Sequence, residues 1–353
     1  MVIVVRPQAP KVELDEIIAV LAEHGLQVHL SEGVDRTIIG VIGDKSALQL
    51  SQIEALPGVE KIVPIMESYK LASKTFRPEG SLVEVKSKGQ GDSKAKGIVL
   101  TVGGKELAIM AGPCAVESEE QIMVSAHAAK LAGAQYLRGG AFKPRSSPYA
   151  FQGLEKEGLI YMRRAADETG LLVVSEITSE NDIDLAIEYI DVIQIGARNA
   201  QNFRLLKEAG KSGVPVLLKR GIAQTIEEWL GSAEYIMSEG NYNIILCERG
   251  IRTFETATRN TLDLSAIPVL KGKTHLPVIV DPSHAAGRVA YVAPLSRAAI
   301  AAGADGLIVE MHPDPRHAVS DASQQLTPTE FLELCKVISK MAPLLDREFK
   351  SGE

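Results

Sequence analysis

Short apolar runs alternate with longer amphipathic stretches from residue 106 to the C-terminus. The runs are "LAIMAG" (107–112), "AQYLRGG" (134–140), "LLVVSEI" (171–177), "DVIQIGA" (191–197), "PVLLKRG" (215–221), "NIILCERG" (243–250), "PVIVDPSH" (277–284) and "GLIVEMHP" (306–313). Runs of this kind are typical of parallel strands that are buried on both faces. Helical patterns lie between or after them, at 118–133, 179–190, 225–240, 292–303 and 328–345.

This alternation predicts an α/β fold. Eight strand–helix units over about 240 residues match a (β/α)8 TIM barrel in number, spacing and size. A doubly wound open sheet is the alternative, but it rarely repeats eight evenly spaced units and favours a glycine-rich first turn. We therefore expect residues 106–353 to form the barrel.

Residues 1–70 have a different and more compact pattern. Strand-like runs and amphipathic helical stretches follow one another in the order βαββαβ, from "VIVVR" to "VEKIVPI". This order predicts a ferredoxin-like domain. Residues 71–105 then contain two alternating runs, "SLVEV" and "IVLTV", on either side of a polar segment at 86–97. They indicate a linker with a β-hairpin.

Composition narrows the class of protein. The chain has 353 residues, and 38 lysines and arginines against 45 aspartates and glutamates give a net charge of −7. This balance argues against nucleic acid or a membrane surface as a partner. No apolar run reaches the ~18 residues of a membrane-spanning helix, and the N-terminus lacks the pattern of a signal peptide. Only three cysteines occur, so we expect a cytoplasmic protein with reduced thiols.

Ionisable side chains gather just after the predicted strands. They are Cys114, Arg138, Lys143, Arg145, Glu176, Arg198, Lys219, Arg220, Glu248, Arg249, Asp281, His284, Glu310 and His312. In a barrel the carboxyl ends of all strands meet at one face, and active sites lie there. Buried ionisable groups are costly unless they are paired, so such a ring predicts a polar, ligand-filled mouth.

Six of these side chains are cations. They are Arg138, Lys143, Arg145, Arg198, Lys219 and Arg249. Because such charges would repel one another around an empty mouth, they predict a ligand with several negative charges, such as a carboxylate with a phosphate.

A second subset offers metal ligands. Cys114, His284, Glu310 and either Asp314 or Asp321 follow the first, seventh and eighth predicted strands, which are neighbours in a closed barrel. One sulfur, one nitrogen and two oxygen ligands suit Mn²⁺, Fe²⁺, Co²⁺ or Zn²⁺. The alternative for Cys114 alone is a buried packing residue.

Seven motifs give the chain a family resemblance. They are "AGPCAVES", "LRGGAFKPRSSPYAFQG", "QIGARN", "LLKRG", "CERGIRTFE", "DPSHAAG" and "IVEMHPDP". With them the chain resembles the 3-deoxy-D-arabino-heptulosonate 7-phosphate (DAHP) synthases, in the short type with an N-terminal ferredoxin-like regulatory domain. The resemblance implies a metal-dependent, aldol-like condensation of phosphoenolpyruvate with erythrose 4-phosphate, the first step of the shikimate pathway to the aromatic amino acids.

The resemblance also implies a role for individual residues. The metal ligands would be Cys114, His284, Glu310 and Asp321, which selects Asp321 over Asp314. Arg145 and Ser146 would contact the phosphate of erythrose 4-phosphate; the family often has threonine at the second position, and serine keeps the hydroxyl. The substrate-binding set is Arg138, Lys143, Pro144, Arg145, Ser146, Ala197, Arg198, Lys219 and Arg249. Lys143 would protonate the nascent alkoxide, so Lys143, Cys114 and His284 are the expected catalytic residues.

For residues 1–70 the resemblance implies feedback inhibition by tyrosine or phenylalanine. His29 and Ser31 end a predicted strand in "VHLSEG" and are the candidate contacts; a strand edge that merely faces water is the alternative. An inhibitor must bind one conformation better than another, so we expect such domains to pair across subunits, in a homotetramer.

Three alternatives remain. 3-Deoxy-D-manno-octulosonate 8-phosphate synthase shares the barrel and phosphoenolpyruvate but uses arabinose 5-phosphate; the "KPRSSPY" loop and the N-terminal domain argue against it. An inactive barrel that only binds a partner would not be expected to keep every candidate ligand. A Schiff-base aldolase needs an isolated lysine, whereas Lys219 adjoins Arg220.

Overall fold

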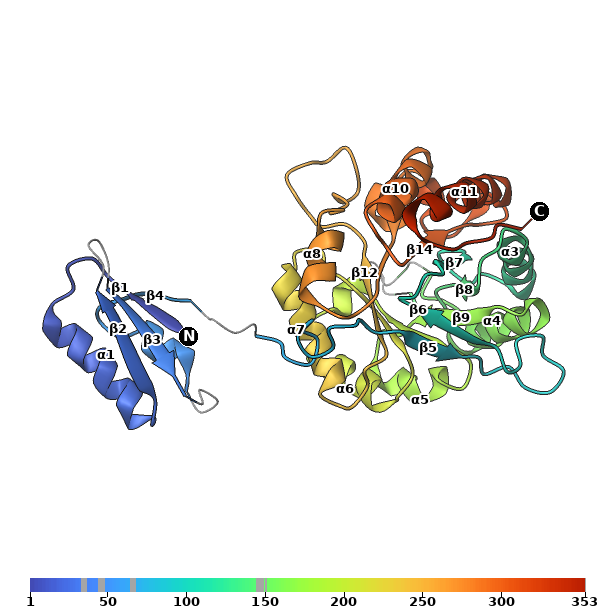
Figure 1. Ribbon diagram of the computed structural model, residues 1–353. Helices are drawn as coiled ribbons and strands as arrows, with labels where there is room; N and C mark the ends of the chain where they lie inside the picture. Colours follow the sequence, from blue (N-terminus) through green and yellow to red (C-terminus); the bar gives the residue numbers. More distant parts are fainter. Residues whose placement is uncertain (33–36, 44–47, 64–67, 144–148, 150, 353) are drawn as a thin grey trace. The chain divides into compact units, whose positions relative to one another are not determined.

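The computed structural model describes residues 1–32, 37–43, 48–63, 68–143, 149 and 151–352. These residues form two compact units, Met1–Ser68 and Tyr69–Glu353, which are coloured blue and blue-to-red in Figure 1. Pro144, Arg145 and Ser146, which the sequence places in the substrate site, lie outside the described residues. No helix in the described part of the chain is long and apolar enough to cross a bilayer.

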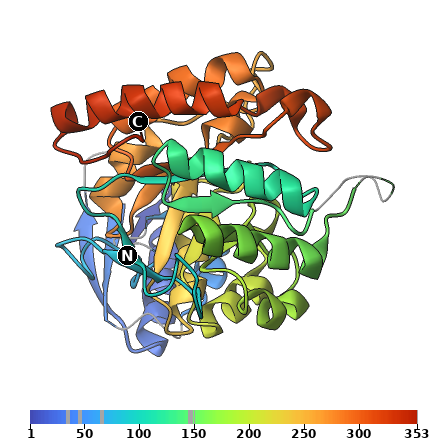
Figure 2. The ribbon, with the colours of Figure 1, turned by 90° about the vertical axis from the view of Figure 1, so that its right-hand side faces the viewer.

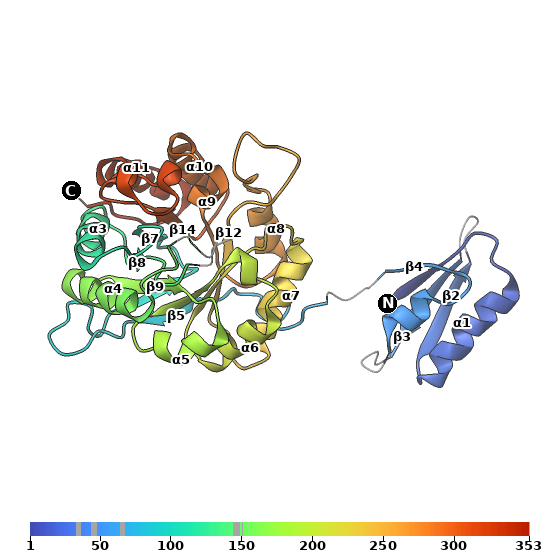
Figure 3. The same ribbon diagram turned by 180° about the vertical axis from the view of Figure 1, so that it is seen from behind.

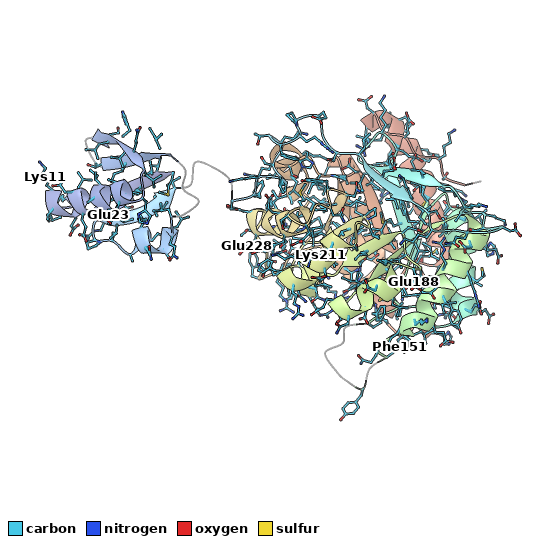
Figure 4. All side chains as sticks on the ribbon, turned by 90° about the horizontal axis from the view of Figure 1, so that it is seen from below. Lys11, Glu23, Phe151, Glu188, Lys211 and Glu228 are labelled. Carbon is cyan, nitrogen blue, oxygen red and sulfur yellow. The ribbon has the colours of Figure 1, made fainter. Side chains whose placement is uncertain are left out.

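The N-terminal unit is a four-stranded antiparallel sheet with two helices. Its elements are β1 (Val2–Val5), α1 (Lys11–Glu23), β2 (Gln27–Glu32), β3 (Thr37–Ile42), α2 (Leu50–Glu54) and β4 (Val59–Val63). The strands are ordered β2-β3-β1-β4, as the ferredoxin-like prediction requires. Ile3 and Ile39 of the sheet are fully buried against Ile17, Leu21 and Ile53 of the helices. The labels Lys11 and Glu23 in Figure 4 mark the two ends of α1.

The second unit contains a closed barrel of eight parallel strands. They are β7 (Ala108–Gly112), β8 (Tyr136–Arg138), β9 (Leu172–Glu176), β10 (Val192–Ile195), β11 (Val216–Lys219), β12 (Ile244–Glu248), β13 (Val278–Val280) and β14 (Gly306–Glu310). Each strand pairs with the next, and β14 pairs with β7 to close the ring. This closure confirms the predicted TIM barrel.

Helices surround the strands, as Figure 3 shows. They are α3 (Glu119–Leu131), α4 (Glu155–Thr169), α5 (Ile183–Ala186), α6 (Phe203–Lys211), α7 (Ile226–Met237), α8 (Ala266–Lys273), α9 (Pro282–Ala286), α10 (Val289–Ala301) and α11 (Pro328–Met341). The first and last of the long ones, α3 and α11, lie side by side (Figure 2), which matches the neighbouring positions of β7 and β14.

A hairpin of β5 (Val83–Lys86) and β6 (Val99–Val102) covers the amino-terminal end of the barrel. Its buried side chains Val83, Val85 and Val102 form one apolar cluster with the residues inside the barrel. That cluster includes Tyr136 and Leu172, the first residues of β8 and β9. The interior is therefore packed and apolar, and the polar mouth lies at the other end.

A connecting segment, residues 69–81, precedes the hairpin and is fixed to the barrel by hydrogen bonds. The backbone N–H groups of Leu71 and Ala72 each donate to the carboxylate of Glu234 on α7, at 2.9 Å. His275 Nε2 lies 2.7 Å from the carbonyl oxygen of Leu71, and its Nδ1 lies 2.7 Å from the hydroxyl of Ser81. The carbonyl accepts from Nε2–H, and burial lowers the pKa of His275; in the neutral imidazole that this favours, the hydroxyl of Ser81 donates to Nδ1.

The helix expected at 179–190 is shorter in the structure. A 3₁₀ turn over Glu180–Asp182 precedes the four-residue α5. The side chain of Ser179 accepts from the N–H of Asn181 and so starts a tight turn instead of a regular first helical turn. The sequence also gave no separate indication of α9, which follows directly after β13.

Candidate active site and metal centre

The closure of the barrel places Cys114 beside Glu310. Glu310 pairs in register with Gly112, two residues before the cysteine. Gly112 has φ of 149°, and a Cβ there would lie 2.1 Å from the carbonyl oxygen of Arg138. Only glycine therefore allows the end of β7 to lie so close to the backbone of β8. One ligand atom each of Cys114, Glu310 and Asp321 lies within 4.8 Å of the others.

His284 is brought to the same place by the short helix α9. Asp281 caps this helix by accepting from the N–H of His284, and Pro282 is its first residue. The other carboxylate oxygen of Asp281 lies 2.7 Å from His284 Nδ1. His284 Nε2 points at the acidic pair, 3.4 Å from Glu310 Oε1 and 3.8 Å from Asp321 Oδ2. A carboxylate on one ring nitrogen with the other nitrogen free to ligate is the usual arrangement of a metal-binding histidine.

The charges around this cluster favour a cation. Burial raises the pKa of Glu310, but the charges of His284 and Arg138 outweigh burial, and the pKa falls to about 2. Burial raises the pKa of the Cys114 thiol to about 11, and Glu310 acts in the same direction while Lys143 opposes it. A bound divalent cation deprotonates a coordinating thiol. The donor set of one sulfur, one imidazole nitrogen and carboxylate oxygens therefore fits a borderline divalent metal.

A cavity of about 270 Å³ opens next to the cluster at the carboxyl ends of the strands. Its described lining includes six cationic side chains and two carboxylates. The cations are Lys143, Arg198, Lys219, Arg249, Arg252 and Arg259, and the carboxylates are Glu176 and Asp321. Ala197 and Gly196 contribute their backbone, and a Cβ at Gly196 would lie only 1.9 Å from Glu176. The excess of positive charge predicts an anionic ligand.

The expected cations are held in different ways. Lys143 Nζ lies 2.9 Å from the carbonyl oxygen and 3.1 Å from the sulfur of Cys114. Lys219 Nζ is 2.5 Å from Asp281 Oδ2. Arg138 is not among the residues that line the cavity; it donates to Glu310 Oε1 at 2.9 Å and to the carbonyl oxygen of Pro113. Burial lowers the pKa of Arg249, so its positive charge is the one that most needs an anion.

Several other candidates lie away from the cavity. Asp314 is partly exposed and contacts His317 at 2.7 Å, and it belongs neither to the described ligand cluster nor to the described lining of the cavity. Arg220 is paired with Glu248 and with Asp263, each at 2.9 Å, which makes it part of the wall of the barrel.

The sequence did not reveal five residues around the site. They are Arg252, Arg259, Asn260, Gln324 and Gln325. Both arginines lie in the loop between β12 and α8. Arg252 is in the motif "CERGIRTFE", four residues after β12, so its spacing could have indicated it, whereas Arg259 is eleven residues after the strand. The only signal for the glutamines is the polar pair that follows Asp321 in "SDASQQL".

His29 and Ser31 lie on β2 of the N-terminal unit, and both are exposed. His29 is opposite Gly40, and Ser31 is opposite Ile38. Paired residues share a face of a sheet, and the core side chain Ile39 lies between these two partners. Both polar side chains are therefore on the face that the helices leave open.

Comparison with known proteins gives the family. Residues 86–347 match the DAHP synthetase I family, and residues 1–67 match the DAHP synthase ferredoxin-like domain. The chain belongs to the DAHP synthetase I family. The first unit corresponds to the second match, which ends one residue before Ser68, where that unit ends.

Individual relatives agree with this assignment. The chain is 49% identical over 345 residues to the phospho-2-dehydro-3-deoxyheptonate aldolase of Thermotoga maritima, and the match covers 98% of each chain. A crystal structure of that aldolase, also called DAHP synthase, superimposes with a TM-score of 0.91 over 99% of both chains. The 2-dehydro-3-deoxyphosphooctonate aldolase of Syntrophotalea carbinolica is more distant, at 33% identity over 64% of this chain.

Proposed function

We propose that this member of the family condenses phosphoenolpyruvate with erythrose 4-phosphate and one water molecule, which adds at carbon 2 of phosphoenolpyruvate, to give DAHP and inorganic phosphate. The observation that carries the proposal is a cavity that has an excess of cationic side chains and lies next to the cluster of Cys114, Glu310 and Asp321, with His284 beside it. Both substrates are phosphorylated and one also has a carboxylate, so together they supply the negative charge that the cavity lacks.

The metal site comprises Cys114, His284, Glu310 and Asp321. A divalent ion held there would supply a Lewis acid for the carbonyl oxygen of the aldose phosphate. Within the chain, Asp281 orients the imidazole of His284 through Nδ1, and Arg138 orients Glu310. The metal, which we infer to be Mn²⁺, Fe²⁺, Co²⁺ or Zn²⁺ from the donor types, is required for turnover.

Phosphoenolpyruvate is bound by Arg198, Lys219 and Arg249, with Arg138 and the backbone at Ala197 nearby. Arginine suits the planar carboxylate and the phosphate because it donates two parallel hydrogen bonds. Lys143 donates the proton that the aldehyde oxygen needs once the carbon–carbon bond has formed. Its position over Cys114 supports this role, because the Nζ–H bonds there already point toward the ligand cluster.

The N-terminal unit supplies regulation. We infer that an aromatic amino acid, tyrosine or phenylalanine, binds at its open sheet face near His29 and Ser31 and inhibits a homotetramer. Support comes from the exposure of both polar side chains and from their common face. An effector that binds at a face of the small domain acts only if it prefers one arrangement of the subunits over another.

A comparison of two aldose phosphates as substrates tests the proposal. Enzyme stripped with EDTA and reloaded with Mn²⁺ is given phosphoenolpyruvate with either erythrose 4-phosphate or arabinose 5-phosphate, and the loss of phosphoenolpyruvate is followed. We expect fast loss only with erythrose 4-phosphate. Preference for arabinose 5-phosphate would instead favour the activity named for the octulosonate relatives. Full activity of the stripped enzyme would exclude the metal requirement.

A further inference from the structure

Gln324 contacts two of the candidate metal ligands with one side-chain amide. Its Nε2 donates to Glu310 Oε2 at 2.6 Å and to Asp321 Oδ2 at 3.2 Å. An amide nitrogen has two hydrogens, so each carboxylate receives one of them. The opposite orientation of the amide would set its carbonyl oxygen against two carboxylates, which electrostatics forbids.

The carbonyl oxygen of the same amide also has a hydrogen-bond partner. Gln324 Oε1 accepts from Arg259 NH1 at 2.9 Å, and the same arginine nitrogen donates to Asp321 Oδ2 at 3.0 Å. Gln324 is buried, with 1% of its surface exposed. A buried amide with its donors and its acceptor satisfied has one orientation and therefore fixes the groups that it contacts.

The neighbouring glutamine holds the backbone of the same loop. Gln325 accepts from the N–H of Cys114 at 3.0 Å and donates to the carbonyl oxygen of Ser320 at 2.8 Å. Asp321 lies between Ser320 and the two glutamines and has φ of 48°, a left-handed conformation that aspartate adopts more readily than most residues. The loop is thus tied to β7 by Gln325 and to β14 by Gln324.

We propose that Gln324 is a positioning residue that aligns Glu310 and Asp321 as metal ligands. Glu310 is carried by β14 and Asp321 by the loop after it, and among the described residues Gln324 is the one whose side chain donates a hydrogen bond to both carboxylates. A neutral amide is suited to this role because it orients carboxylates without a charge that would compete with the cation. The inference rests on the proposed metal site.

Titration with Co²⁺ alone tests the proposal, because a cobalt–thiolate bond absorbs in the near ultraviolet and reports Cys114 directly. We expect Gln324→Leu to weaken Co²⁺ binding about tenfold to a hundredfold, as is usual when an outer hydrogen-bond partner of a ligand is lost. Gln324→Met, which keeps an unbranched chain of similar length, should behave in the same way if leucine disturbs folding.

Gln135→Leu is the matched control. Gln135 donates to the carbonyl oxygen of Leu107 and accepts from the N–H of Ile109 near the amino-terminal end of the barrel, so its loss affects stability without touching the ligands. We expect wild-type Co²⁺ affinity for this variant. Equal affinity of the wild type and both Gln324 variants would overturn the role of Gln324 and leave the metal site intact. A wild type without the thiolate band would overturn the metal site itself, and with it this inference.

Discussion

The surroundings of the Cys114 thiol raise its pKa and so disfavour its ionisation when no cation is bound beside it. The side chain is buried, its pKa is raised to about 11, and Asp321 Oδ2 lies 3.7 Å from the sulfur. Cys247 and Cys335 are also buried, and burial raises the pKa of both thiols. Lys219 and the carboxylates of Asp281 and Glu248 also act on Cys247. What distinguishes Cys114 among the described cysteines is that its sulfur lies within 4.8 Å of carboxylate oxygens of both Glu310 and Asp321.

Replacement of Cys114 by serine should weaken the binding of the metal and remove most of the turnover, because a hydroxyl is a much poorer ligand than a thiolate for a borderline ion. Metal content and the rate of phosphoenolpyruvate loss are measured together. Cys335→Ser on α11 is the control, and it should keep both the metal and the activity. A Cys114→Ser enzyme with full metal content and full turnover would contradict the prediction.

Arg249 provides the second prediction at this scale. It lines the cavity, is buried, and has its pKa lowered by burial, with Asp281 opposing. Arg249→Ala should raise KM for phosphoenolpyruvate about tenfold to a hundredfold, which corresponds to the loss of a charge-assisted contact of about 1.5–3 kcal/mol. The KM for erythrose 4-phosphate should change far less. Equal changes for both substrates would show that Arg249 does not belong to the phosphoenolpyruvate site. The exposed Arg316→Ala serves as the control.

At the scale of elements, the connecting segment 69–81 depends on a neutral histidine. Burial lowers the pKa of His275 below its usual value of 6.5, a hydrogen bond to Leu71 opposes this, and Arg77 and Lys74 lower it further, while Glu79 raises it. The folded protein therefore binds a proton at His275 less readily than the unfolded chain does. The neutral imidazole of His275 therefore contributes fully to the free energy of unfolding above pH 6.5, and this contribution is lost as the pH falls below that value.

His275→Gln should therefore make unfolding less sensitive to acid. Between pH 7.5 and pH 5.5 the free energy of unfolding of the wild type should fall more steeply than that of His275→Gln. The difference between the two slopes is at most about 1.4 kcal/mol per pH unit, the value for one proton. Glutamine can still donate to Leu71 and accept from Ser81, so the segment remains attached. Chemical denaturation at each pH gives the slopes, with the exposed His317→Gln as control. Identical slopes for the wild type and His275→Gln would refute the linkage.

The order of strands and helices could be predicted from the sequence because buried parallel strands are nearly all apolar, and their number and spacing match one closed barrel. The separate helix α9 was not predicted because its five residues are too few to show a helical periodicity, although the cap residues Asp281 and Gly287 and the first residue Pro282 are visible in the sequence. Gln324 could not be predicted either. Its role depends on the closeness of Glu310 and Asp321, and no pattern of spacing along the chain encodes that closeness.

The described residues of the candidate active site all lie in the second of the two units. Every described ligand and cation of the cavity lies after residue 113, whereas the N-terminal unit ends at Ser68 and has its own apolar core. Each unit can therefore be tested for its own role.

Deletion of residues 1–68 should leave an active enzyme that tyrosine or phenylalanine no longer inhibits. The cut leaves Leu71 and Ala72 in place, and these hold the connecting segment to Glu234. In the full chain, His29→Ala should weaken inhibition without lowering turnover. Rates at increasing amino-acid concentration give the comparison, with Lys11→Ala on α1 as a surface control. If the shortened enzyme is still inhibited by the same amino acid, the effector binds to the barrel.

The hairpin β5–β6 also determines how molecules reach the catalytic centre. It seals one end of the barrel with valines, and the interior behind it is filled by side chains such as Tyr136 and Leu172. In the described part of the chain, both substrates and both products therefore share the opening at the carboxyl ends of the strands. A change that narrows this shared opening should therefore slow the capture of both substrates, even if it alters no group that takes part in the reaction.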